Sequence, residues 1–303
     1  MIDIVITSFN EPKSTLHLAK DFLKQLKGRE GRVIVVDPFE SVGEYLGKEI
    51  KDPKFKFILD PGEGKSYALN MIFQDYGSSN TEDLFVLTDG DVNVSPNTLH
   101  TILNAFKNKK IGCVTARPVP LDKRDTKYGY WAHLFFSGIH KARKEFSRNK
   151  KFFECSGYLF TIRKGVISDF PLETSEDSII PYLFWKKGYL IKYIPEIEVY
   201  VKNPSNWRDW INQKTRNIKA HENLNKIAPD MPRTKSFFNE IKLGTLFALS
   251  YPKNLREVFW TAQAFLARFY IYYKSFFEIN KGKSYADGWR GEAETASTRI
   301  DYL

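Results

Sequence analysis

Residues 83–91 read DLFVLTDGD, a continuous apolar run that ends in two aspartates separated by a glycine. Such a run is typical of a strand that is buried on both faces of a sheet. Upstream, strands are predicted at 2–8, 32–37 and 54–60, an amphipathic helix at 14–26 and two further helices at 42–50 and 65–77. Strands that alternate with helices predict an α/β fold, in which helices flank a mostly parallel sheet.

Polar side chains follow these strands at the point where each strand ends. Ligands of parallel sheets bind beyond the carboxyl ends of the strands, so these residues are expected to share one site. Asp89 and Asp91 supply two close carboxylates, which favour Mg²⁺ or Mn²⁺ held together with substrate phosphates. The polar residues of this rim are Thr7, Ser8, Asn10, Glu11, Asp37, Asp60, Asp89 and Asp91.

The rest of the chain is less regular. Strands are predicted at 111–119 and 152–163, a helix from 175, a pair of strands within 189–201 and a long helix from 206. The last part, 231–303, is predicted to be a separate helical extension, because apolar residues recur at helical spacing through 255–277. Three interpretations of this apolar face remain open. It docks on the rest of the chain, it joins a second subunit to form a homodimer, or it lies in a membrane interface. Gln263 and Arg268 argue against a complete membrane span.

The net charge of +10 is unevenly distributed, since residues 117–151 carry ten Lys/Arg and three acids. This segment is either a solvated helical face or a surface for phosphates or anionic lipid. No helix-turn-helix, zinc-finger or stacking-sheet motif supports nucleic-acid binding. Two cysteines cannot form a disulfide framework or a four-ligand zinc site, and they predict a reducing, cytoplasmic setting.

Three other short motifs indicate a catalytic or binding role less specifically than the two aspartates do. Residues 62–66, GEGKS, lack the first glycine of a phosphate-binding P-loop, because Leu59 occupies that position. The turn can still bring Lys65 close to a pyrophosphate. Residues 174–177, TSED, are explained equally well as an acidic helix N-terminus, and Gln213 and Arg216 are ordinary on an exposed helix.

The order of these motifs is more specific than any of them alone. TSFNEP at 7–12, Asp37, GKSYALN at 64–70, DGD at 89–91, CSGYLFTIR at 155–163, SED at 175–177 and QKTRN at 213–217 resemble the family-2 glycosyltransferases over about residues 2–225. The resemblance implies a GT-A fold and an inverting, metal-dependent transfer of a sugar from a UDP- or GDP-sugar donor. It predicts a catalytic domain at 1–230, with a nucleotide-binding half at 1–115 and an acceptor half at 116–230.

The resemblance also implies a role for each matching residue. Asp177 would be the general base, and Asp91 would hold the Mn²⁺ or Mg²⁺ ion on the diphosphate. The floor where donor and acceptor meet would be formed by Ser156 and Gly157, beside Glu176. The nucleotide and the donor sugar would contact Thr7, Asn10, Glu11, Asp37, Lys65, Asp89 and Arg216.

Departures from the family pattern limit the prediction. Processive synthases of the family have Trp after the arginine of the last motif, where this chain has Asn217, and they carry membrane spans. We therefore expect a single addition to a hydroxyl or phosphate of a glycan or lipid-linked acceptor. The expected location is cytoplasmic, with peripheral contact to anionic lipid at the inner face of the cell membrane. The alternatives are a nucleotidyltransferase and an inactive nucleotide-sugar-binding protein.

Overall fold

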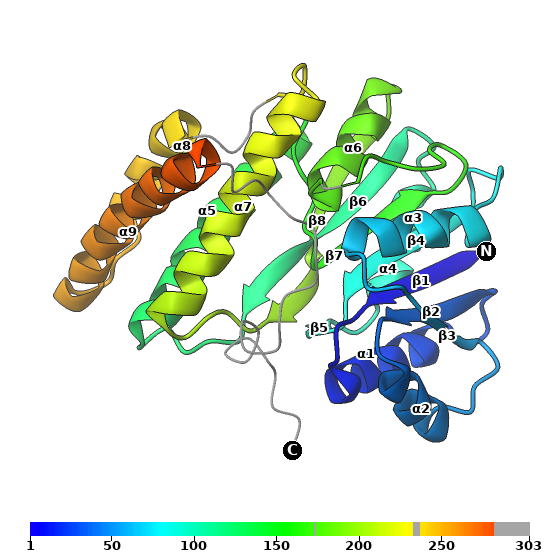
Figure 1. Cartoon of the computed structure of the whole chain (residues 1–303). Helices are drawn as coiled ribbons and strands as arrows, with labels where there is room; N and C mark the ends of the chain where they lie inside the picture. Colours follow the sequence, from blue (N-terminus) through cyan, green and yellow to red (C-terminus); the bar gives the residue numbers. More distant parts are fainter. Residues whose placement is uncertain (173, 233–236, 282–303) are drawn as a thin grey trace.

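The computed structural model describes residues 1–172, 174–232 and 237–281, with the side chains of 237–243 excepted (Figure 1). Of the predicted extension 231–303, residues 233–236 and 282–303 therefore lie outside the described part.

The first third of the chain has the alternating order that the sequence predicts. Its strands are parallel neighbours in the order β3-β2-β1-β4, so their carboxyl ends meet at one edge. Apolar residues fill the strands because both faces of this sheet are covered by helices. The elements are β1 (Ile2–Thr7), α1 (Pro12–Gln25), β2 (Gly31–Asp37), α2 (Glu40–Glu49), β3 (Phe55–Leu59), α3 (Lys65–Tyr76) and β4 (Leu84–Asp89).

The second part extends the same sheet to the order β3-β2-β1-β4-β7-β6-β8-β5. Strand β7 is antiparallel to β4 and β6, whereas β6 and β8 are parallel, so the sheet is mixed beyond β4. The elements are β5 (Val92–Val94), α4 (Thr98–Phe106), β6 (Ile111–Pro120), α5 (Lys127–Arg148), β7 (Leu159–Arg163), α6 (Glu176–Lys186), β8 (Leu190–Val201) and α7 (Trp207–Ile227).

Two local predictions for this part are wrong. The strand predicted at 152–163 forms only as β7, and residues 152–158 form a buried loop. Phe152, Phe153 and Cys155 of this loop pack into the core, which explains why the segment resembles a buried strand. The strand pair predicted within 189–201 is one long strand, β8, whose pairing with β6 is interrupted by register shifts.

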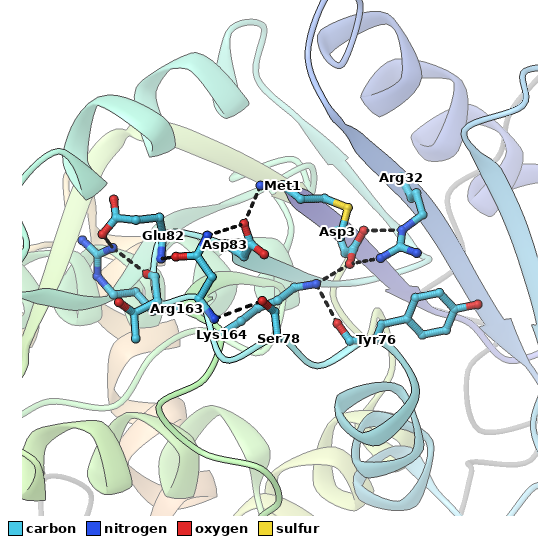
Figure 2. Close-up of polar contacts among 11 residues, drawn as sticks. Met1, Asp3, Arg32, Tyr76, Ser78, Glu82, Asp83, Arg163 and Lys164 are labelled. Atoms are coloured by element: carbon cyan, nitrogen blue, oxygen red, sulfur yellow. Dashed lines mark hydrogen bonds and ion pairs between the residues drawn. The ribbon is translucent and has the colours of Figure 1, made fainter.

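The sheet separates two apolar cores. Residues of α1, α2 and α4 pack on one face, and residues of α3 and α6 pack on the other (Figure 1). At the amino ends of the strands, away from the polar rim, lies a buried ion cluster (Figure 2). Asp3 accepts two hydrogen bonds of 2.7 Å from Arg32 and pairs with the fully buried ammonium of Lys164. This end of the sheet is therefore fixed by charge pairing inside the protein.

Helices α8 (Phe237–Ser250) and α9 (Leu255–Asn280) pack on the far side of α5 and α7 from the sheet (Figure 1). A third apolar cluster, which includes Trp131, Trp210 and Ile271, joins α5, α7 and α9. Arg124 also holds α9, since its guanidinium donates two hydrogen bonds of 3.0 and 2.8 Å to Glu257.

Helix α9 docks through a different face from the one its apolar pattern suggests. Its buried residues are mostly small or polar: Glu257, Thr261, Ala264, Ala267, Ile271 and Ser275. The large apolar side chains remain exposed instead: Leu255, Val258, Phe259, Phe265, Leu266, Phe269, Tyr270, Tyr273, Phe276 and Phe277. We call this set the outer face of α9. Among the described residues, no helix is both long and apolar enough to span a bilayer.

Candidate active site

A cavity of about 1530 Å³ opens at the carboxyl ends of β1 and β4. Most of the predicted site residues line it: Thr7, Ser8, Glu11, Lys65, Asp89, Asp91, Ser156, Gly157, Glu176, Asp177 and Arg216. Asn10, Asp37 and Asp60 do not, and Asp60 instead accepts a hydrogen bond of 2.6 Å from the Gly62 backbone N–H of its own turn. Residues that lie more than 200 positions apart in the sequence therefore contribute to one cavity. The carboxyl ends of β1 and β4 bring Thr7 and Asp89 together, and α3, α6, α7 and the 152–158 loop add the other residues.

Asp37 organises the loops beside the cavity. Its carboxylate is fully buried and accepts hydrogen bonds from Ser8 Oγ at 2.6 Å, the Asn10 backbone N–H at 3.0 Å and the Phe39 backbone N–H at 2.9 Å. Burial raises the pKa of Asp37, against the effect of these donors. Asn10 has a φ of 53°, in the left-handed region. Asp37 and Asn10 thus fix the turn that presents Glu11 to the cavity. The contact of Asp37 and Asn10 with a nucleotide remains a prediction.

Lys65 links three elements at the polar end of the cavity. It is the first residue of α3 and follows Gly64, whose φ of 112° favours glycine. Its Nζ lies 2.5 Å from Asp89 Oδ1 at the end of β4 and 2.6 Å from Glu176 Oε1 at the start of α6. Desolvation opposes the charge of Lys65, but the two carboxylates outweigh it and raise its pKa. Burial raises the pKa of Glu176 to about 7, although Lys65 acts in the opposite direction.

The carboxylate of Asp177 is held in a fixed orientation beside this pair. Its Oδ1 accepts a hydrogen bond of 2.6 Å from Ser175 Oγ, and its Oδ2 accepts one of 3.2 Å from the Gly157 backbone N–H. A Cβ on Gly157 would lie 3.4 Å from Glu176 Oε1 and 3.6 Å from Asp177 Oδ2, so glycine keeps the cavity floor open here. A carboxylate has about four acceptor positions, which leaves Asp177 able to accept a proton.

Asp91 is the residue through which the site could hold a metal ion. It follows Gly90, where a Cβ would lie 2.7 Å from Thr15 Oγ1 and 2.9 Å from Ser8 Cβ. The nearby carboxylate of Asp89 is already bound to Lys65. No group of three or more potential ligands occurs among the described residues. Mg²⁺ is commonly held by one or two carboxylates and substrate phosphates, so the donor set fits an ion that a diphosphate would complete.

Part of the cavity lining has no counterpart among the predicted site residues. Arg143 of α5, Glu154 of the 152–158 loop and His221 of α7 all line the cavity. Glu154 Oε2 accepts a hydrogen bond of 3.0 Å from Ser178 Oγ and lies 3.6 Å from His221 Nε2. Arg143 resembles the other basic residues of 117–151 in the sequence, and Glu154 lies in the segment predicted as a strand. Neither position carries a signal that separates it from its neighbours.

Comparisons with known proteins agree with this architecture. The family model described as "Glycosyltransferase like family 2" matches residues 2–220. The crystal structure of mannosyl-3-phosphoglycerate synthase from Rubrobacter xylanophilus shares the fold, with a TM-score of 0.54 and 11% identity over 77% of this chain and 76% of that chain. A search of curated protein sequences gives no significant match.

The family match covers most of the chain and contains nearly all of the residues that form the polar end of the cavity. The structural comparison independently supports the GT-A-like arrangement of a sheet flanked by helices. The chain therefore belongs to glycosyltransferase-like family 2 and is a glycosyltransferase.

Proposed function

We propose that the protein transfers one sugar from a UDP- or GDP-sugar to an acceptor, with inversion at the anomeric carbon and Asp177 as general base. The observation that carries this proposal is the position of Asp177. Its carboxylate is fixed by Ser175 and Gly157 in the same cavity as the Lys65–Asp89 pair and Asp91. The proposed base, the ammonium of Lys65 and the carboxylate proposed to hold the metal ion thus line the same cavity.

In the proposed step, Asp177 takes the proton of an acceptor hydroxyl. The acceptor oxygen then forms a bond to the anomeric carbon, while the bond from that carbon to the diphosphate oxygen breaks. Attack from the face opposite the diphosphate inverts the anomeric centre in a single displacement. A positioned base contributes typically 10²–10⁴-fold to such a step.

Positive charge is needed to neutralise the negative charge that develops on the leaving diphosphate. Arg216 lines the cavity from α7, and Lys65 lines it from α3. Asp91 would hold a divalent cation, Mn²⁺ or Mg²⁺, which supplies Lewis-acid stabilisation of the diphosphate. Thr7, Glu11 and Asp89 lie where the nucleotide and donor sugar would enter, at the ends of β1 and β4. Glu176 contributes by holding Lys65 in place at the floor.

The test compares Asp177→Asn with the wild type. Asparagine has a similar size and keeps an acceptor oxygen, but it cannot accept the proton. With Mn²⁺ and a panel of UDP- and GDP-sugars, we expect donor binding to be retained and transfer to fall at least about 10²-fold. The matched control is Asp125→Asn, at an exposed position away from the cavity, which should retain full activity.

Full activity of Asp177→Asn would remove Asp177 as the base. If the wild type bound none of these donors, the proposed function would be wrong. If it bound a donor but neither transferred nor hydrolysed the sugar, the chain would be the inactive nucleotide-sugar-binding protein that the sequence leaves open.

The outer face of α9 supports two further proposals. The first is peripheral contact with anionic lipid at the inner face of the cell membrane, favoured by the basic residues of α5. The second is a homodimer through the C-terminal helices. Flotation with anionic liposomes and sedimentation of the lipid-free protein separate them, because a dimer would sediment at twice the monomer mass without lipid.

A further inference from the structure

The cavity continues from the candidate active site into a second, apolar part. This part is lined by four helices, with Leu134 and Phe135 on α5, Ile218 on α7 and Phe247 on α8. Helix α9 contributes from Val258 to Tyr272. With a rise of 1.5 Å per residue, this stretch of α9 is about 21 Å long. The space that holds the reacting groups is therefore continuous with a long stretch lined mainly by apolar side chains, with Lys141 of α5 and Arg268 of α9 also in its lining.

Arg143 of α5 lines the cavity and binds the floor loop. Its side chain lines the cavity but is only 8% exposed, and one guanidinium nitrogen donates a hydrogen bond of 2.5 Å to the carbonyl oxygen of Cys155 in the floor loop. The buried nitrogen Nη1 has no hydrogen-bond partner, and no carboxylate pairs with Arg143 within the described part of the chain. Burying an unpaired charge is strongly unfavourable, so this site is suited to a bound anion.

The placement of Arg143 along α5 associates this anion site with the apolar part. Gly138 of the same helix faces the ring of Phe247, since a Cβ at this glycine would lie 3.5 Å from Phe247 Cε1. Arg143 follows five residues later, about 7.5 Å further along the helix axis. Cys155, to which it binds, precedes the floor residues Ser156 and Gly157. An anion at Arg143 would thus lie next to the floor, with apolar side chains on its other side.

The outer face of α9 borders the apolar part. Leu266 and Phe269 line the cavity and are also 72% and 63% exposed. Large apolar side chains that remain this exposed mark a surface that meets another apolar phase. The cavity is thus continuous, through side chains that belong to both, with the apolar surface of the protein.

We propose that the acceptor is a membrane lipid with a phosphate in its head group. The phosphate binds Arg143, the hydrocarbon tail lies in the apolar part between α5, α8 and α9, and a head-group hydroxyl reaches Asp177. This inference rests on the proposed function, because the lipid hydroxyl is the acceptor of that reaction. The bonds formed and broken are those described above, and the proton passes from the hydroxyl to Asp177.

The test measures binding without turnover. Decyl phosphate is titrated into the full chain with tryptophan fluorescence as the signal, and decanol, hexyl phosphate, inorganic phosphate, UDP and GDP are titrated separately. We expect decyl phosphate to bind more tightly than decanol and inorganic phosphate. Each methylene contributes about fourfold in affinity when it is fully buried, so hexyl phosphate should bind at least about tenfold more weakly.

Arg143→Gln tests the anion site. Glutamine is polar but carries no charge, and Arg148→Gln is the matched control on an exposed turn of the same helix. We expect Arg143→Gln to weaken decyl phosphate binding about 10–100-fold, with UDP and GDP binding unchanged. Arg143→Lys should retain part of the affinity.

The part of the cavity that would hold the hydrocarbon tail is tested at α9. Leu266→Gln should weaken decyl phosphate binding several-fold, whereas Leu255→Gln, at an exposed position outside the cavity, should have no effect.

Three results would overturn the inference. Equal binding of decanol and decyl phosphate would remove the anion site. If Arg143→Gln weakened UDP or GDP binding and left decyl phosphate unchanged, Arg143 would belong to the donor site. If the wild type bound and hydrolysed a nucleotide sugar but did not bind decyl phosphate, the lipid acceptor would be wrong and the proposed function would stand. Arg143-dependent binding of decyl phosphate without any nucleotide binding would support the lipid site and contradict the proposed function.

Discussion

Replacing Lys65 with methionine should destabilise the protein in a way that depends on pH. The ammonium of Lys65 lies between Asp89 and Glu176, at 2.5 and 2.6 Å, and its side chain is 17% exposed. Methionine keeps most of the volume but leaves two neighbouring carboxylates without their cation. Removing one partner of a buried ion pair costs about 3–5 kcal/mol. We expect about 3 kcal/mol, the lower end, because Asp89 is 26% exposed and remains partly solvated.

The pH dependence follows from Glu176. Its pKa is raised to about 7 in the folded protein, against 4.5 as its ordinary value, so the folded state binds the proton more tightly than the unfolded state. The contribution of Glu176 to the free energy of unfolding is fully present below pH 4.5 and is lost as the pH rises to about 7. The loss amounts to roughly 3 kcal/mol, at 1.36 kcal/mol per pH unit. Lys65 lowers the pKa of Glu176, so its removal raises that pKa further. The variant should therefore continue to lose stability above pH 7, where the wild type no longer does.

The assay is urea unfolding followed by tryptophan fluorescence between pH 5 and pH 9. The free energies of unfolding of wild type and Lys65→Met should diverge above pH 7 by up to about 1.36 kcal/mol per pH unit. Adding Glu176→Gln to the variant should abolish that divergence, because glutamine does not ionise. Lys107→Met, at an exposed lysine, should follow the wild type. Parallel curves for wild type and Lys65→Met above pH 7 would refute the coupling between Lys65 and Glu176.

Two further predictions concern buried ion pairs away from the cavity. Asp3→Asn should destabilise the protein by about 3–5 kcal/mol in urea, because Lys164 is left buried without its carboxylate, and the double variant with Lys164→Met should recover part of the loss. Glu257→Gln should weaken the docking of α9 on Arg124 by about 1.5–3 kcal/mol, seen as faster hydrogen exchange in α9 at neutral pH. The hydrogen bonds from Arg124 lower the pKa of Glu257 to about 2, so this contribution is present above pH 4.5 and should disappear as pH falls to about 2.

The first half of the fold was predictable because its signals are local. Ile4, Val5 and Ile6 are all fully buried, and a strand covered on both faces must be apolar without interruption. The cluster of polar residues at the strand ends was predictable for a geometric reason, since the carboxyl ends of parallel strands meet at one edge. The general position of Lys65, Asp89 and Asp177 in one cavity follows from those two properties together with the family resemblance.

Individual contacts within the site were not predictable in this way. Asp37 follows its strand as expected, but its acceptor positions are used by Ser8, Asn10 and Phe39 of the neighbouring loops. The Lys65–Glu176 pair joins residues that are 111 positions apart, and no sequence spacing indicates it. Hydrogen bonds between distant loops depend on side-chain placement to within a few tenths of an ångström, which a residue pattern does not specify.

The sequence by itself determined that 117–151 is basic and that 255–277 is helical and rich in large apolar residues. The tertiary structure decided which of these side chains are buried. Arg143 is buried and binds the Cys155 carbonyl oxygen of the 152–158 loop, while Arg148 of the same helix stays exposed. Helix α9 docks through Ala264 and Ala267 because small side chains allow close approach to α5 and α7, and this leaves its large apolar residues outside. Composition fixes what a helix can bury, but the shape of the surface that it meets selects the face.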